Sequence, residues 1–436
     1  MLQQNCDNES RRKPPLSGPT GQTATIPFYG LVRSRPFFTV LRRVFKAFQY
    51  RDFRLMWVGA CTSSIGTWMQ IVAQAWLVYD LSKSGFLLGL DMFLGGIPLF
   101  LFSLFGGVLA DRIDRRRVLL ASQYVQMSSA FTLTALVLFH QVHIWHILAL
   151  SFVSGCAQAF GSPAYLALIP TLVKKEDMPN AIALNSIQFN TATVIGPMLG
   201  GLAMVKLGNA WCFGLNGLSF LAPIASLSML HMRIVPEKTT ESVLDSMKEG
   251  FRFIHRHSAM EALMVLAFAM TALGVPARTF LPVIARLIFH GGPGIYTSFL
   301  SVAGVGSVLG ALAVAGLGNV AHKGRIALAM LILLGAVITA FALSRSLPFS
   351  YAMLFLNGAL MVGVFSMVNS LVQLITTNEM RGRVMSVYSF AFRGGMPMGN
   401  LVAGWLVPIF TAPTVLAVNG VLLAALGYTF CSCIAG

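Results

Sequence analysis

The sequence predicts an all-α membrane protein with twelve transmembrane helices in two pseudo-symmetric six-helix bundles. Of its 436 residues, 56% are hydrophobic and only 11% are charged, whereas a soluble globular chain carries about 25% charged residues. The apolar residues gather in runs of about 18–25 residues, the length that crosses a roughly 30 Å hydrocarbon core. The sequence lacks ten-residue segments of alternating polarity, which disfavours a transmembrane β-barrel. This composition also excludes an intrinsically disordered chain, a solvated coiled coil and a typical cytosolic enzyme.

The apolar runs follow one another along most of the chain, and several contain Gly or Pro, which membrane helices tolerate better than soluble ones. With boundaries set to within a few residues, they are 54–80, 85–110, 118–139, 144–170, 181–206, 210–231, 259–285, 295–317, 326–344, 349–373, 384–408 and 413–434. The longest connection between runs, 232–258, divides six from six. Residues 197–203 in the fifth run resemble residues 397–403 in the eleventh, as expected of parallel half-repeats in a transporter.

Basic residues fall mainly in the connections that would share one face of the membrane. The chain has 31 Lys and Arg against 15 Asp and Glu, a formal net charge of +16. Of the 31 basic residues, 25 lie in the N-terminal arm and in alternate connections after it, and four lie on the other face. The positive-inside rule therefore predicts that both termini are cytoplasmic. The positive charge marks orientation in a lipid bilayer, and it does not indicate a nucleic-acid partner.

Four segments follow from this organisation. They are a basic cytoplasmic arm (1–48), an N-terminal six-helix bundle (49–231), a central cytoplasmic loop (232–258) and a C-terminal six-helix bundle (259–436). The arm contains no apolar run or signal peptide, and its basic clusters fit either a solvated tail or contact with anionic headgroups. Apolar residues recur at helical spacing in the central loop, which predicts an amphipathic helix on the membrane face.

The connection at 107–117 carries the most ordered motif, Gly-Val-Leu-Ala-Asp-Arg-Ile-Asp-Arg-Arg-Arg. A carboxylate among guanidiniums at a helix junction can clamp neighbouring helix ends together through charge-assisted hydrogen bonds. Plain positive-inside topology is the alternative, and it explains the arginines but not the ordered residues before them. We predict a cytoplasmic gate that contains Gly107, Asp111, Arg112, Arg115, Arg116 and Arg117, together with Glu379, Arg381 and Arg383 at the equivalent inner face.

Three charged residues lie well inside the apolar runs, away from their ends. Asp91 is the only carboxylate well inside a run, and intramembrane acids are functional-site hypotheses by default. We therefore expect Asp91 to couple protons, or to pair with Arg278 at a periplasmic gate. Arg393 lies at mid-depth, where it can meet an anionic substrate. The alternatives are snorkelling to the interface for Asp91 and Arg278, and a structural helix–helix bond for Arg393.

Uncharged polar side chains in the first and fifth runs are candidates for a substrate cavity. Gln70 and Gln74 share one helix face because they are four residues apart. With Arg393, the cavity candidates are Gln70, Gln74, Asn185, Gln188 and Asn190. Interhelical hydrogen bonding is the alternative role. The six cysteines form neither CxxC pairs nor clusters with His, so we predict no disulfide framework and no metal site.

Several motifs occur in the order that is typical of one family. The 107–117 run resembles the signature loop of the major facilitator superfamily, with Asp114 where that loop usually has Gly. The following segments, within roughly 49–434, are similar to the transmembrane secretion effector branch: 53–55, 66–70, 73–79, 180–186 and 381–386. The resemblance implies a multi-pass exporter in the bacterial inner (plasma) membrane. It would use the proton gradient rather than a cofactor, and its cargo would be a siderophore, a macrolide or another drug-like compound.

The fifth run also contains a stretch that resembles the second half of the superfamily's antiporter motif. It comprises Gly196, Pro197, Gly200 and Gly201. Pro removes a backbone hydrogen bond and Gly allows close approach, so the resemblance implies that this helix bends against its neighbour. Ordinary glycine packing is the alternative.

These observations together predict a secondary active transporter, not an enzyme, that exports a small molecule by alternating access as a monomer. The sequence has no nucleophile elbow, paired carboxylates or HExxH-type run that would support an enzyme. A facilitator or importer of another solute is the alternative within transport. A non-transporting membrane sensor or scaffold is the alternative from another class.

Overall fold

Every regular element of the computed structural model is a helix within the residues that it describes, which are 45–112, 114–230, 243–317, 322–377 and 379–435. From Phe45 onward the chain belongs to one compact unit. The predicted arm, 1–48, therefore falls outside the described residues as far as residue 44. The all-helical fold that the sequence predicts is confirmed.

The longer helices of the first half occupy the six predicted apolar runs, and two short 3-10 helices lie outside these runs. In chain order, these helices are η1 (Lys46–Gln49), α2 (Arg51–Ser82), α3 (Gly85–Arg112), α4 (Arg115–Leu138), α5 (Ile144–Leu172), η2 (Lys175–Asp177), α6 (Met178–Lys206), α7 (Asn209–Ser219) and α8 (Leu221–Met229). The second half opens with α9 (Val243–His255), which lies in the predicted central loop. It continues with α10 (Ser258–Gly274), α11 (Pro276–Thr279), α12 (Leu281–Leu287), α13 (Pro293–Leu317), α14 (Lys323–Leu343), α15 (Leu347–Ile375), α16 (Arg381–Phe410) and α17 (Ala412–Ala435).

Eight helical stretches in the described part of the chain are long and apolar enough to cross a membrane. They belong to α3, α5, α7 with α8, α10 to α12, α13, α14, α15 and α17. The four other long helices, α2, α4, α6 and α16, are not among these eight. A multi-pass helical membrane protein is thus confirmed, and the count of exactly twelve spans in two bundles stays a prediction.

Proline breaks two of the predicted runs into shorter helices. The sixth run divides at Phe220, because Pro223 cannot donate a hydrogen bond to the carbonyl one turn before it. The seventh run divides twice, at Val275 before Pro276 and at Phe280 before Pro282. These breaks turn the C-terminal part of the seventh run into the two short helices α11 and α12, and α11 carries Arg278.

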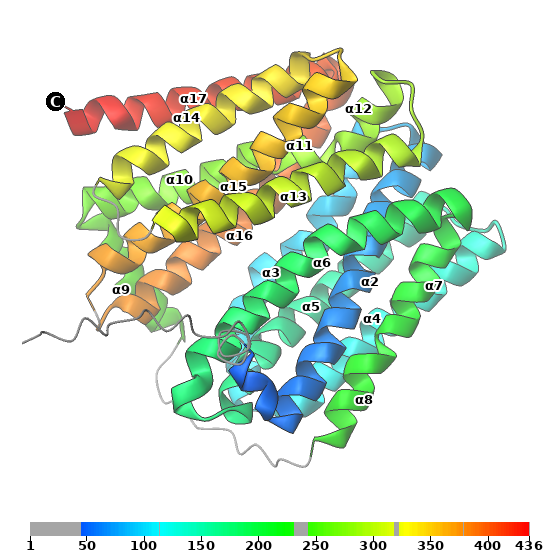
Figure 1. Cartoon of the computed structure of the whole chain (residues 1–436), viewed down its shortest axis with the longest axis horizontal. Helices are drawn as coiled ribbons and strands as arrows, with labels where there is room; N and C mark the ends of the chain where they lie inside the picture. Colours follow the sequence, from blue (N-terminus) through cyan, green and yellow to red (C-terminus); the bar gives the residue numbers. More distant parts are fainter. Residues whose placement is uncertain (1–44, 113, 231–242, 318–321, 378, 436) are drawn as a thin grey trace, which may run out of the picture. The chain divides into compact units, whose positions relative to one another are not determined.

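Consecutive long helical segments run in opposite directions when α7 with α8 and α10 to α12 are each taken as one segment, so their connections gather at two ends of the molecule (Figure 1). We call the end with the α3–α4, α5–α6 and α15–α16 connections the basic face, because most predicted gate residues lie there. We call the end with the α2–α3, α4–α5 and α12–α13 connections the opposite face.

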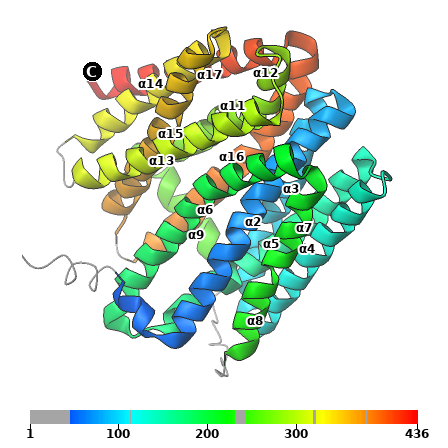
Figure 2. The same ribbon diagram turned by 45° about the vertical axis from the view of Figure 1, so that its right-hand side comes forward.

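The two halves pack together from the opposite face to mid-depth. Near the opposite face, the rings of Trp76 on α2 and Tyr296 on α13 stack with centroids 6.0 Å apart. Gly89 on α3 lies against the backbone of α16, and α3 and α16 pass beside each other (Figure 2). Near mid-depth, the rings of Phe100 and Phe390 pack at 4.2 Å.

Candidate functional site

Asp91 is buried between helices of the first half, with only 1% of its surface exposed. It lies near the start of α3, where Gln74 Nε2 on α2 donates to both carboxylate oxygens, at 3.1 and 3.0 Å. Ser151 Oγ on α5 donates to Oδ1. Both partners are uncharged, and no cation in the described part of the chain pairs with this carboxylate. Asp91 is therefore an isolated buried acid that does not snorkel to the interface.

Gln74 belongs to a chain of amides that reaches from Asp91 to α7. Gln74 Nε2 also donates to Ser151 Oγ at 2.8 Å, and its Oε1 accepts from Gln70 Nε2 at 3.5 Å. Gln70 Oε1 in turn accepts from Asn216 Nδ2 at 2.7 Å. Gln74 thus orients the buried acid, and Gln70 bonds to Gln74. Contact between them and a substrate stays a prediction.

Arg278 lies in the second half and has a partner of its own. Its Nη2 donates to Ser307 Oγ on α13 at 3.0 Å, and its buried Nε has no hydrogen-bond partner among the described groups. Ser307 also donates to the carbonyl of Gly358 at 3.2 Å, so the contact joins α11, α13 and α15. Asp91 and Arg278 do not form the predicted pair in this structure, because each is held by uncharged partners.

Arg393 is half-buried on α16 and makes neither a hydrogen bond nor an ion pair with any described residue. The structural helix–helix bond considered for it is therefore not formed. The same helix carries two more polar groups without partners in the described part: the buried hydroxyl of Tyr388 and both polar atoms of the Asn400 amide. Part of α16 thus has unused hydrogen-bonding capacity.

The cavity candidates on α6 mainly bond to other helices. Asn185 accepts from the hydroxyl of Tyr165 on α5 at 2.9 Å, and Gln188 donates to Ser64 Oγ on α2 at 2.7 Å. Asn190 donates to a carbonyl one turn earlier in α6, at 2.8 Å. These contacts match the interhelical alternative for Asn185 and Gln188.

The predicted bending motif is a packing surface in this structure. The helix α6 continues without interruption through Pro197. Gly196 and Gly200 lie directly against α2, while Gly201 lies against Thr297 of α13. A side chain at Gly201 would overlap Thr297, so glycine permits the close approach of the two halves here. Helix bending stays a prediction.

The arginines at the start of α4 hold the ends of first-half helices. Arg115 Nη1 donates to the carbonyl of Ala167 on α5 at 3.3 Å, and Arg116 Nη2 donates to a carbonyl near the end of α8 at 2.9 Å. Asp114 caps α4 by accepting from the backbone N–H of Arg116 at 3.0 Å, and it lies 3.9 Å from Arg117 Nε. The remaining gate residues of this connection, Gly107, Asp111 and Arg112, lie outside the described side chains.

The gate residues predicted on the second half have different neighbours. Arg383 Nη1 pairs with Glu249 Oε2 at 2.5 Å, which ties the start of α16 to α9. Gly250 lies against the backbone of Arg383 and allows this approach. Glu379 is exposed, and Arg381 lines a cavity beside α15.

Sequence reasoning missed a polar cluster at the N-terminal end of α2. We call Asp177 and its partners Lys46, Gln49 and Tyr50 the latch. Asp177, in η2, is 4% exposed and accepts hydrogen bonds from Gln49 Nε2 at 2.9 Å and from the Tyr50 hydroxyl at 2.8 Å. Lys46 Nζ lies 2.7 Å from its other oxygen. The ammonium of Lys46 and the hydroxyl of Tyr50 hold the pKa of the Asp177 carboxyl below its ordinary value. The acidic pair Glu176–Asp177 before a helix is the only sequence signal, and it does not identify the partners.

Comparison with known proteins covers almost the whole described region. The family model of the transmembrane secretion effector matches residues 43–434. The multidrug efflux pump Tap of Mycolicibacterium fortuitum is 26% identical over 362 residues, which are 80% of this chain and 88% of Tap. The enterobactin exporter EntS of Shigella boydii is 26% identical over 383 residues, which are 86% of this chain and 90% of EntS.

Solved transporters share the fold at low sequence identity. The nucleoside transporter NupG superposes with a TM-score of 0.69 at 14% identity, over 87% of this chain and 98% of its own. A POT family transporter in complex with 5-aminolevulinic acid gives a TM-score of 0.72 at 10% identity, over 88% and 96% of the two chains. At these identities, the likeness concerns the fold alone.

Proposed function

Because the chain belongs to the transmembrane secretion effector family and is a membrane transporter of the major facilitator type, we propose that it exports a small molecule in exchange for protons. The relatives named above are an efflux pump and a siderophore exporter, which supports export of a siderophore, a macrolide or another drug-like compound. The single observation that carries proton coupling is the isolated buried carboxyl of Asp91.

A carboxylate in this position is a suitable proton carrier. A buried charge without a paired cation is costly, and the binding of a proton removes that charge. Gln74 and Ser151 hold the side chain in place without neutralising it. The amide chain to Gln70 and Asn216 connects Asp91 with α2 and α7, so a change at Asp91 reaches several helices of the first half.

The packing of the two halves supports alternating access. The contacts described above join the halves near the opposite face, including the stacked pair Trp76 and Tyr296. We propose that the basic face is cytoplasmic, as the positive-inside rule predicts, that both termini lie there, and that this state opens to the cytoplasm. Arg393, without a partner on the described residues, is the proposed contact for a polar group of the cargo at mid-depth.

Transport by reconstituted protein tests this proposal. Proteoliposomes that contain the purified chain receive an imposed pH gradient and a panel of anionic, neutral and cationic dyes, with and without a protonophore. We expect gradient-driven dye movement in the native chain. Asp91→Asn should abolish it while leaving dye binding intact. Asp80→Asn is the matched control, because Asp80 is an exposed acid paired with Lys83 at the end of α2.

Gradient-driven movement that survives in Asp91→Asn would exclude Asp91 as the proton carrier. Dye movement that ignores the gradient in the native chain would indicate a facilitator instead. Binding without movement of any dye would favour a sensor or scaffold.

A further inference from the structure

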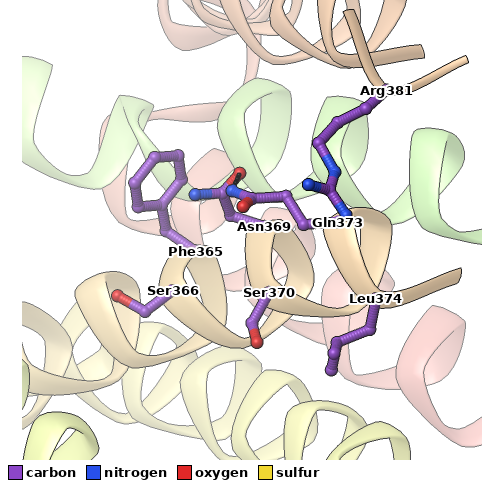
Figure 3. A pocket seen from close by; sticks show the side chains of 7 residues that line it. All are labelled: Phe365, Ser366, Asn369, Ser370, Gln373, Leu374 and Arg381. Atoms are coloured by element: carbon purple, nitrogen blue, oxygen red, sulfur yellow. Dashed lines mark hydrogen bonds between the residues drawn. The ribbon is translucent and has the colours of Figure 1, made fainter. Parts of the chain in front are cut away.

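A cavity of about 390 Å³ opens between the end of α15 and the start of α16, near the basic face. Its volume lies in the range of small-molecule sites. Phe365, Asn369, Gln373 and Arg381 are among its lining residues, and Figure 3 shows that the Arg381 side chain descends from α16 toward Gln373 on α15. We call this cavity the vestibule. The predicted substrate cavity does not include it.

The wall formed by α15 presents polar groups at helical spacing. Asn369 and Gln373 are four residues apart and share a face. Gln373 Nε2 donates to Asn369 Oδ1 at 3.4 Å. This bond occupies the acceptor of Asn369 and leaves its amino group available as a donor, because Asn369 makes no other hydrogen bond within the described residues.

The charged groups that line the vestibule or bond to its lining are positive among the described residues. Arg381 has no ion-pair or hydrogen-bond partner in the described part of the chain. Lys323 Nζ, at the start of α14, lies 3.5 Å from Ser370 Oγ, which also lines the vestibule. The described residues that line the vestibule include no carboxylate, and Glu379, two residues before Arg381, is exposed and does not pair with it. A guanidinium with all its donors free binds a carboxylate through two parallel hydrogen bonds.

The end of the vestibule toward mid-depth is aromatic. Phe365 is half-buried, and its ring packs on Phe392 with centroids 4.8 Å apart. Phe392 directly precedes Arg393 in α16, so the aromatic wall and the arginine lie at a similar depth. A planar apolar group can stack on such a wall while its charged end stays at Arg381.

We propose that the vestibule binds an amphipathic organic anion, with its carboxylate on Arg381 and its aromatic body against Phe365. Lys323 adds long-range attraction, and the Asn369 amino group supplies a further donor. The proposal rests on the proposed function, in which cargo enters from the basic face, and it narrows the cargo to an anion with an apolar ring system.

The test uses carboxyfluorescein as the anionic probe and rhodamine 6G as the cationic one. The full chain in phosphatidylcholine nanodiscs is titrated with each dye, and binding is followed by fluorescence anisotropy. Arg381→Gln should weaken carboxyfluorescein binding about tenfold, the lower range for a hydrogen bond to a charged group at an exposed site. Binding of rhodamine 6G should not weaken. Raised salt should weaken carboxyfluorescein binding to the native chain more than to the variant.

Two further variants separate the parts of the site. Arg345→Gln is the matched control, because Arg345 is an exposed arginine near the opposite face, and it should leave carboxyfluorescein binding unchanged. Phe365→Ala should also weaken carboxyfluorescein binding, because the probe loses its stacking surface. Size-exclusion profiles and thermal unfolding verify that each variant is folded.

Equal carboxyfluorescein affinity in the native chain and in folded Arg381→Gln would overturn the proposal. If proton-driven dye movement still depended on Asp91 in that case, the proposed function would stand and only the vestibule would fail. Loss of carboxyfluorescein binding in Arg381→Gln, together with native transport that is independent of the pH gradient, would support the proposed vestibule site and refute proton coupling.

Discussion

Gly201→Ala should shift the transporter away from the state that is closed at the opposite face. The glycine lies where α6 of the first half meets α13 of the second, and an added methyl group would overlap Thr297. Overpacking of this kind costs about 1–3 kcal/mol, and the cost falls only on the state in which the two helices touch. Since about 1.4 kcal/mol is tenfold in an equilibrium constant, the ratio of the open state to the closed state should rise roughly 5- to 150-fold.

The measurement uses Tyr296→Cys, since Tyr296 is 3% exposed beside this contact. Detergent-purified protein reacts with a maleimide, and labelling at that residue is quantified by peptide mass spectrometry. The rate should rise with the open population in Gly201→Ala. Gly95→Ala is the matched control, because no atom beyond the adjoining backbone of its own helix and its chain neighbours lies within 4 Å of the added methyl group, and its gain in helix propensity, about 1 kcal/mol, is the same. An unchanged rate in Gly201→Ala, or an equal rise in Gly95→Ala, would refute the reasoning.

Two further predictions concern the basic face. Asp177→Asn should release η1 from η2 and change the fluorescence of Trp57, whose ring packs on Phe48; unchanged fluorescence would contradict the latch. In the native chain, the contribution of the latch to stability is fully present above the unfolded pKa of Asp, about 4. That contribution should be lost as pH falls through the lowered pKa of Asp177. An acid titration of Trp57 fluorescence should therefore show one transition that Asp177→Asn lacks. Asp114→Ala should lower the free energy of unfolding by about 1 kcal/mol in thermal unfolding, because α4 loses its cap. Asp80 caps no described helix, so Asp80→Asn should change the free energy of unfolding less.

The sequence predicts the helices and singles out the charged residues inside the apolar runs, but it does not predict the groups to which those residues bond. Asp91 stands out because a carboxylate inside an apolar run is costly wherever the helix packs. Ser151, which donates to it, lies in another run, and helical periodicity describes the faces of one helix without saying which helices are neighbours. Because the sequence does not say which helices are neighbours, it suggests a pair of Arg278 with Asp91. In the structure, Arg278 bonds to Ser307 instead.

Local sequence rules were also incomplete at helix ends. In the sequence, Asp114 is a departure from the family loop, and in the structure it is the N-cap of α4. Asp177 gave no comparable signal, because its partners lie before α2, more than a hundred residues away. Residues that act within one turn of helix are thus predictable in principle, while those that join distant segments require the fold.

The three charged residues well inside the apolar runs are divided between the halves: the acid Asp91 is buried in the first, and the bases Arg278 and Arg393 are partly buried in the second. A proton and an anion bound at these residues would therefore not displace each other from a shared site. Each would influence the other through the surface between the halves, which includes the contacts of α3 with α16 and α11 and of α6 with α13. Thermodynamic linkage then requires reciprocity: the factor by which a proton on Asp91 changes the affinity for cargo equals the factor by which cargo changes the affinity of Asp91 for a proton. We therefore expect substitutions at glycines of this surface, such as Gly89 and Gly201, to change that factor.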